Sequence, residues 1–345
     1  MKKLTALLVA LMLLCSAAAF AADTDIAILV PNADHGWTGA VLTYAEEKAE
    51  AINAEGKYTA KVISSADPAN QIAQVEDIIE NESANSIVIL PQDNTLEATM
   101  KKLADSGIPF VMFDRVIDTV SEQAVASIKG DNNGIGAETA KRFIADGMVP
   151  GDKILIMPGD NSSVPQMRND GFFAVLLENG WTQEQVDAIE STAYTGWSRS
   201  EGKRLFTEWL DSCTVEEIAE HKWIFTHDDE IAMGILEALK SSEIDTAKKD
   251  AFLSAGVHLG TSSGLNEIYS VLKGIHQKDY SAEVAGLADL FSVTYDPAMI
   301  QIAVDDMITS LEGGEVAKDH VIAVSVVDAT NVNEFQGFGD AVAVE

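Results

Sequence analysis

Polar and aromatic side chains gather in the short segments that follow the predicted strands of this 345-residue chain. Asp114 and Arg115 come directly after an apolar run, and Trp37 and Trp197 stand in polar loops that contain glycine. Carboxylates accept hydrogen bonds and guanidinium groups donate them, so together they can bind the hydroxyl groups of a sugar. Indole rings add flat apolar walls for the C–H face of a sugar ring. These residue types predict a site for a neutral polyhydroxyl ligand.

The same polar residues also allow structural interpretations. Asp114 and Arg115 can form an ion pair that only stabilises the end of a strand. Asp228 and Asp229 precede an apolar helix pattern and can cap its N-terminus, and Asp229 is the better candidate because it stands closer to that pattern. The other three tryptophans are expected to pack rather than to bind: Trp181, Trp209 and Trp223.

Motifs for catalysis or cofactor binding do not accompany these residues. The segment 133–136 lacks the third glycine of the dinucleotide-binding fingerprint, because Thr139 stands in its place. The six histidines show no metal-binding spacing. A glycosidase needs two carboxyl groups in distinct acid and base environments, and the sequence identifies no such pair. We therefore predict a binding protein that is not an enzyme and that uses no metal or cofactor.

Strand and helix patterns alternate along the chain, and they must position the candidate residues. Asp67-Pro68 is typical of the start of a helix, with an N-cap followed by proline. The alternation predicts an α/β fold with two doubly wound parallel-sheet domains. Ligands of such sheets bind beyond the carboxyl ends of the strands, where the candidate residues stand. Short apolar runs mark the expected strands, at 26–30, 62–63, 86–90, 110–113, 125–128, 153–157, 223–226 and 252–254.

The N-terminal residues 1–21 have the pattern of a secretory signal peptide. A basic start is followed by an apolar run and by Ala-Phe-Ala before the expected cleavage site. The mature chain is thus expected to begin near Ala22 and to be periplasmic or otherwise extracytoplasmic. Cys15 offers the alternative of a lipoprotein, but Leu14 is a poor match to the small residue that precedes a lipidated cysteine.

The charge and the cysteine content narrow the function classes further. The formal net charge is −32, which repels nucleic acid and anionic lipid, so neither is expected as a partner. After signal cleavage Cys213 is the one remaining cysteine, so an intrachain disulfide is not possible. The expected product is a monomer held together by burial rather than by covalent links.

Several segments together resemble the type I periplasmic sugar-binding proteins, the group that binds ribose, xylose and galactose or glucose. The segments that carry the resemblance are 67–72, 107–115, 131–132 and 228–234. The resemblance implies two α/β domains joined by three crossing strands, near Asp131, Ser292-Val293 and Ile322. It implies an N-terminal domain of residues 22–131 plus 293–322 and a C-terminal domain of residues 132–292 plus 323–345.

The resemblance also implies a set of binding residues and a mechanism. The family usually has an acidic residue after the strand expected at 252–256, and His258 is expected to take its place, while a polar contact at the third crossing falls near Thr294 or Tyr295. The implied function is capture of a pentose- or hexose-like sugar by hinge closure and delivery to the permease of an ABC importer. The alternative is a sensor that presents its ligand to a chemoreceptor or sensor kinase. The binding positions fall on His35, Trp37, Asp114, Arg115, Arg168, Trp197, Asp228 and His258.

Overall fold

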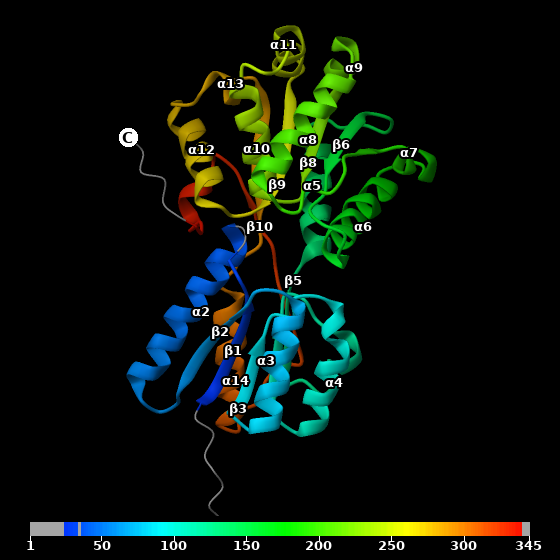
Figure 1. Cartoon of the computed structure of the whole chain (residues 1–345). Helices are drawn as coiled ribbons and strands as arrows, with labels where there is room; N and C mark the ends of the chain where they lie inside the picture. The colour runs from blue at the N-terminus through cyan, green and yellow to red at the C-terminus, as the bar shows by residue number, and fades with distance from the viewer. Residues whose placement is uncertain (1–23, 34–35, 340–345) are drawn as a thin grey trace, which may run out of the picture.

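The computed structural model of this protein describes residues 24–33 and 36–339. Two six-stranded sheets form two halves that lie one above the other in Figure 1. The predicted signal peptide, including Cys15, lies outside the described residues, as does His35. Within the described part of the chain, no helix has the length and apolar character needed to span a membrane.

The first half is built on the sheet that begins with β1. All of its strand pairs are parallel, in the order β11-β5-β4-β3-β1-β2. Apolar runs such as Phe110–Phe113 form its strands because every residue of that run is buried between the sheet and its covering helices. The strands are β1 (Thr24–Pro31), β2 (Ala60–Ser65), β3 (Ala84–Ile89), β4 (Phe110–Phe113), β5 (Ala126–Gly130) and β11 (Asp319–Ile322). The helices are α2 (Gly36–Glu55), α3 (Pro68–Asn81), α4 (Glu97–Ser106) and α14 (Met299–Leu311). Two short 3-10 turns are η1 (Asn94–Leu96) and η2 (Asp118–Val120).

The second half repeats this design on the sheet of order β12-β10-β9-β8-β6-β7, in which β12 alone runs antiparallel. Its strands are β6 (Lys153–Met157), β7 (Glu190–Ser191), β8 (His221–Thr226), β9 (Val257–Ser263), β10 (Leu287–Thr294) and β12 (Val326–Val327). Its helices are α5 (Asn132–Ala145), α6 (Ser163–Glu178), α7 (Gln183–Asp187), α8 (Arg199–Ser212), α9 (Val215–Glu220), α10 (Asp229–Lys240), α11 (Thr246–Ser254), α12 (Asn266–Gln277) and α13 (Ala282–Ala285), and η3 (Val332–Glu334) follows β12.

The chain passes between the two halves at three places in the described residues (Figure 1). These are the steps from β5 to α5, from β10 to α14 and from β11 to β12. The predicted fold class, two doubly wound α/β domains, is confirmed. The residue limits that we give to each domain stay a prediction.

Two local expectations are confirmed and two are wrong. Asp67 caps α3 by accepting from the Asn70 amide, and Trp181, Trp209 and Trp223 are buried in the core. The expected strand at 252–254 is instead the end of α11, where the ring of Phe252 packs edge-on against Phe206 at 5.2 Å between centroids. The cap of α10 is Asp228 and not Asp229, because the Asp229 side chain turns inward to bind other backbone amides.

Candidate functional site

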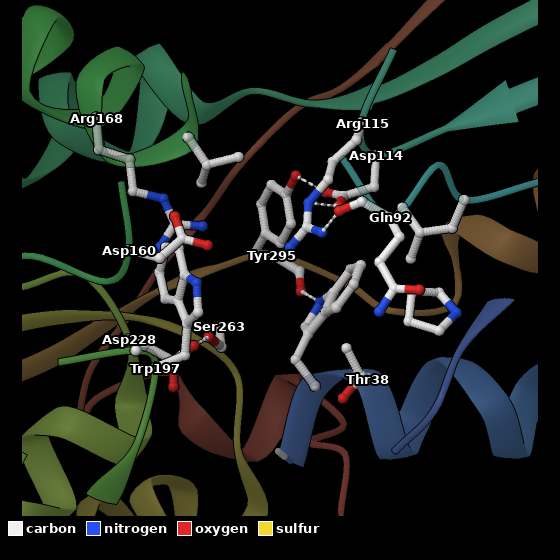
Figure 2. A pocket seen from close by; sticks show the side chains of 15 residues that line it. Thr38, Gln92, Asp114, Arg115, Asp160, Arg168, Trp197, Asp228, Ser263 and Tyr295 are labelled. Atoms are coloured by element: carbon white, nitrogen blue, oxygen red, sulfur yellow. Dashed lines mark hydrogen bonds and ion pairs between the residues drawn. The ribbon is translucent and has the colours of Figure 1, made fainter. Parts of the chain in front are cut away.

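A cavity of about 310 Å³ lies between the two halves, at the carboxyl ends of their strands. Figure 2 shows side chains of the first half on one side and of the second half on the other, with Tyr295 between them. Six of the eight residues predicted from the sequence line this cavity: Trp37, Asp114, Arg115, Arg168, Trp197 and Asp228. The polar groups among its other lining residues are Thr38, Gln92, Asp160, Ser263 and Tyr295.

Asp114 and Arg115 extend from the end of β4 into the cavity. The backbone of Asp114 is left-handed, with φ 61°, and its amide donates to Ile128 O over 2.8 Å, which continues the sheet by one residue. One carboxylate oxygen accepts from the Tyr295 hydroxyl, and the other lies 4.0 Å from Arg115 Nε. Arg115 Nη1 donates to Gln92 O, and Arg115 Nε is buried without a hydrogen-bond partner among the described residues. The pair therefore places a carboxylate and a guanidinium side by side in the wall of the cavity.

Trp37 forms an aromatic wall from the first turn of α2. Its indole N–H donates to Tyr295 O over 2.9 Å, and its ring lies 5.6 Å from the Tyr295 ring at a tilt of 40°. The side chain is 7% exposed, so the indole is fixed in place before any ligand arrives.

Arg168 is buried in the second half because two helices meet closely there. A Cβ on Gly136 of α5 would lie 1.8 Å from Arg168 O, and a Cβ on Gly171 of α6 would lie 1.9 Å from Asn133 O, so both glycines are required for this approach. Arg168 Nε donates to Asn132 Oδ1 over 3.0 Å. The burial of its guanidinium lowers the pKa of Arg168 from its ordinary value.

The contacts of the Arg168 guanidinium fix its orientation in the cavity wall. Nη1 donates to His227 O and to Ser262 Oγ, the latter over 2.9 Å. The group also lies between two aromatic rings, 5.3 Å from the Trp197 ring and 5.1 Å from the Tyr295 ring. Arg168 can thus present a rigid positive group to an oxygen of the ligand.

Trp197 and Asp160 come from two loops of the second half that pack together. Trp197 has a left-handed backbone with φ 62°, and a Cβ on Gly159 would lie 2.3 Å from its ring, so only glycine leaves the space that the indole fills. Burial on its own would raise the pKa of Asp160, but hydrogen bonds from Ser162 and Trp197 and the charge of Arg115 bring it below its ordinary value. Asp160 is therefore ionised and faces Arg115 across the cavity.

The third carboxylate of the cavity, Asp228, is held at the start of α10. Asp228 accepts from the Glu230 amide over 2.8 Å and from the Ser263 hydroxyl. Burial and the neighbouring Asp229 raise the pKa of Asp228 to about 7. Asp229 is fully buried and accepts from the amides of Gly264 and Leu265, each over 2.8 Å, which fixes the loop after β9.

His258 is not brought to the cavity. It lies near the start of β9, where its ring stacks on Trp223 at 4.3 Å between centroids and its Nδ1 is 3.3 Å from an oxygen of Asp146. Because β9 runs to residue 263, the residue at the carboxyl end of this strand that lines the cavity is Ser263. Residue 258 was expected there because the strand was placed several residues too early. The prediction for His35 lies outside the described residues.

Five polar residues of the cavity are not among the eight predicted binding residues: Thr38, Gln92, Asp160, Ser263 and Tyr295, although Tyr295 was one of two positions expected for the polar contact at the third crossing. Gln92 and Asp160 stand in loops directly after β3 and β6, and Tyr295 directly follows β10. Ser263 gave no signal because the polar end of β9 does not look like a strand. The position after a strand was the signal that could have identified Gln92 and Asp160, because ligands of parallel sheets bind beyond the carboxyl ends of the strands.

Comparison with known protein families identifies one model. The model of the periplasmic binding protein domain matches residues 26–261 of this chain.

Two curated proteins show similar sequences. The ribose import binding protein RbsB of Bacillus subtilis is 26% identical over 181 residues, which cover 52% of this chain and 54% of that protein. The fructose import binding protein FruE of Bifidobacterium longum is 23% identical over 272 residues, covering 78% and 74%. The match thus spans about half the length of the ribose import protein and three quarters of the fructose one.

Solved structures show the same fold at lower sequence identity. A galactofuranose binding protein superposes with a TM-score of 0.71 at 19% identity, covering 90% of this chain and 96% of that one. The binding component of the arabinose ABC transporter of Shewanella sp. ANA-3, bound to arabinofuranose, superposes with a TM-score of 0.68 at 17% identity, covering 90% and 94%.

Proposed function

The chain belongs to the periplasmic binding protein family, and from this premise we propose that it captures a small neutral sugar between its two halves and delivers it to an ABC importer. The observation that carries the proposal is the composition of the cavity, which combines three carboxylates and two arginines with indole walls from both halves. Such groups bind a neutral ligand with many hydroxyls, since each hydroxyl both donates and accepts. No bond of the ligand needs to be made or broken.

Both halves contribute residues to the cavity, and this supports binding by closure of the halves. Trp37, Asp114 and Arg115 belong to the first half, and Arg168 and Trp197 belong to the second. A ligand that contacts both sets gains the full interaction only when the halves approach each other, so it favours the closed form. The three crossing segments are the places where the backbone can bend.

The expected ligand is a monosaccharide, pentose- or hexose-like. A cavity of about 310 Å³ lies at the small end of ligand pockets, which run from about 300 to 1,000 Å³. The named sequence relatives import ribose and fructose, which supports this size class. The proposed partner is the membrane permease of the importer, and the proposed location is outside the cytoplasmic membrane.

A thermal-shift screen of the mature protein tests the proposal. D-ribose, D-fructose, L-arabinose, D-galactose and myo-inositol are compared with sugar acids and amino acids. A ligand present at 100 times its Kd adds about 2.7 kcal/mol of stability, a shift that is easily measured. We expect at least one neutral sugar or polyol to raise the melting temperature. A response to charged solutes alone would contradict the proposal.

A further inference from the structure

Tyr295 occupies the point where the two halves and the cavity meet. It follows β10 directly and is 5% exposed. Its amide donates to Ser263 O over 2.9 Å in the second half, and its carbonyl accepts from Trp37 Nε1 over 2.9 Å in the first. The backbone of this one residue therefore touches both halves.

The side chain of Tyr295 links the same two halves through polar groups. Its hydroxyl donates to Asp114 Oδ1 in the first half and accepts from Asn132 Nδ2 over 3.3 Å at the start of α5. Asn132 Oδ1 in turn accepts from Arg168 Nε over 3.0 Å. We call Asp114, Tyr295, Asn132 and Arg168 the interdomain bridge, because they form one continuous hydrogen-bonded chain from β4 to α6.

The first crossing segment is shaped to receive the Tyr295 ring. A Cβ on Gly130, the last residue of β5, would lie 2.0 Å from the ring. The Arg168 guanidinium lies 5.1 Å from the ring centroid. The ring is thus held between one of the backbone segments that connect the halves and a buried residue of the second half.

The Tyr295 hydroxyl is already used on both sides by the protein. It donates to a carboxylate and accepts from an amide, and it keeps its proton because burial and Asp114 raise its pKa well above the ordinary value. A residue whose task was to bind the ligand alone would leave one of these capacities free.

We propose that Tyr295 is a positioning residue that ties the two halves together and holds Asp114 opposite Arg168. With these contacts in place the two halves sample a narrow range of relative angles, and a ligand meets a preformed pair of charged groups. Preorganisation of this kind reduces the ordering that binding requires. The inference stands without the identity of the ligand, because it rests on contacts between the two halves.

The test measures distances between the halves without ligand. Spin labels are placed on exposed cysteines introduced as Asp105→Cys in α4 and Glu184→Cys in α7, with Cys213→Ser to remove the native thiol. Both helices lie on the same side of the molecule (Figure 1). Double electron–electron resonance then gives the distance distribution for the wild-type background and for Tyr295→Phe. We expect the distribution to become broader, with a larger mean distance, when the hydroxyl is removed.

Matched variants separate this role from a general loss of stability. Tyr280→Phe removes a hydroxyl from a tyrosine that is 46% exposed and should leave the distribution unchanged. Asp114→Ala removes the acceptor at the other end of the same hydrogen bond and should broaden the distance distribution as Tyr295→Phe does. This second variant tests the proposal if Tyr295→Phe fails to fold. A folded Tyr295→Phe or Asp114→Ala variant with the wild-type distribution would overturn the proposal.

Discussion

Asp114 and Asp228 each stand after a strand, one in each half, and the charged groups around their carboxylates differ. Asp114 follows β4 and has a cation beside it, with Arg115 Nε at 4.0 Å. Asp228 follows β8, accepts from the Glu230 amide and the Ser263 hydroxyl, and has a second buried carboxylate beside it, Asp229, whose effect on the pKa of Asp228 is larger than that of the Arg168 charge. The comparison teaches that the same position at the carboxyl edge of a parallel sheet can place a carboxylate beside an arginine in one half and beside a second carboxylate, which raises its pKa, in the other.

The largest effect is expected from Asp229→Ala, which removes the buried carboxylate next to Asp228. It would leave the amides of Gly264 and Leu265 and the Ser292 hydroxyl without their acceptor. Each unpaired buried donor costs about 1–3 kcal/mol, so we expect a loss of about 3–5 kcal/mol in the free energy of unfolding, measured by urea denaturation. Asp229→Asn keeps one acceptor oxygen and should lose clearly less. Equal losses for the two variants would show that the acceptor is not what matters.

Asp114→Ala should have a different profile, with a large effect on binding and a smaller effect on stability than Asp229→Ala, because it leaves one buried donor, the Tyr295 hydroxyl, without its acceptor rather than three. The side chain supplies an acceptor in the cavity, and a hydrogen bond to a charged group is worth about 1.5–3 kcal/mol. Affinity for the sugar identified by the screen should fall roughly 10- to 150-fold by calorimetric titration. If Asp114 serves only as an ion-pair partner, melting without ligand would drop while the affinity of the folded protein stayed nearly constant.

Asp228 should make the stability of the protein depend on pH. The pKa of Asp228 rises from an ordinary value near 3.8 to about 7 on folding, so the folded protein binds more protons than the unfolded chain between these values. Stability contributed by this group therefore falls as pH rises from about 4 to about 7 and is constant above. Asp228→Asn should remove this slope and gain about 1–2 kcal/mol at pH 8: the raised pKa corresponds to roughly 4 kcal/mol against the charged form, and the weaker bonds from the Glu230 amide and the Ser263 hydroxyl offset part of it. Melting curves across pH 4–8 check this, and an unchanged slope would contradict it.

The sequence predicted those parts of the molecule that depend on local pattern. Apolar runs located β1, β4 and β8, and six of eight predicted site residues line the cavity because strand ends converge in this fold. Strand β9 could not be located, since Gly260 and the three polar residues after it are buried by tertiary contacts rather than by an apolar pattern. The hydrogen bond between Tyr295 and Asp114 joins positions 181 residues apart, and no local pattern encodes such a contact.

The smallest effect is expected at Ser263, where two contributions oppose each other. Its hydroxyl donates to Asp228, and losing a bond to a charged group destabilises the fold, but its backbone has φ 136°, a conformation that favours glycine. Ser263→Ala loses the bond and keeps the strain, so we expect a loss of about 1–2 kcal/mol at pH 8. Ser263→Gly loses the same bond but relieves the strain, so its loss should stay below about 1 kcal/mol.

At pH 5, where Asp228 is largely protonated, the loss for Ser263→Ala should shrink because the acceptor is no longer charged. Urea denaturation of both variants at the two pH values tests this, and a glycine variant that loses more than the alanine variant would show that the backbone at residue 263 is not strained.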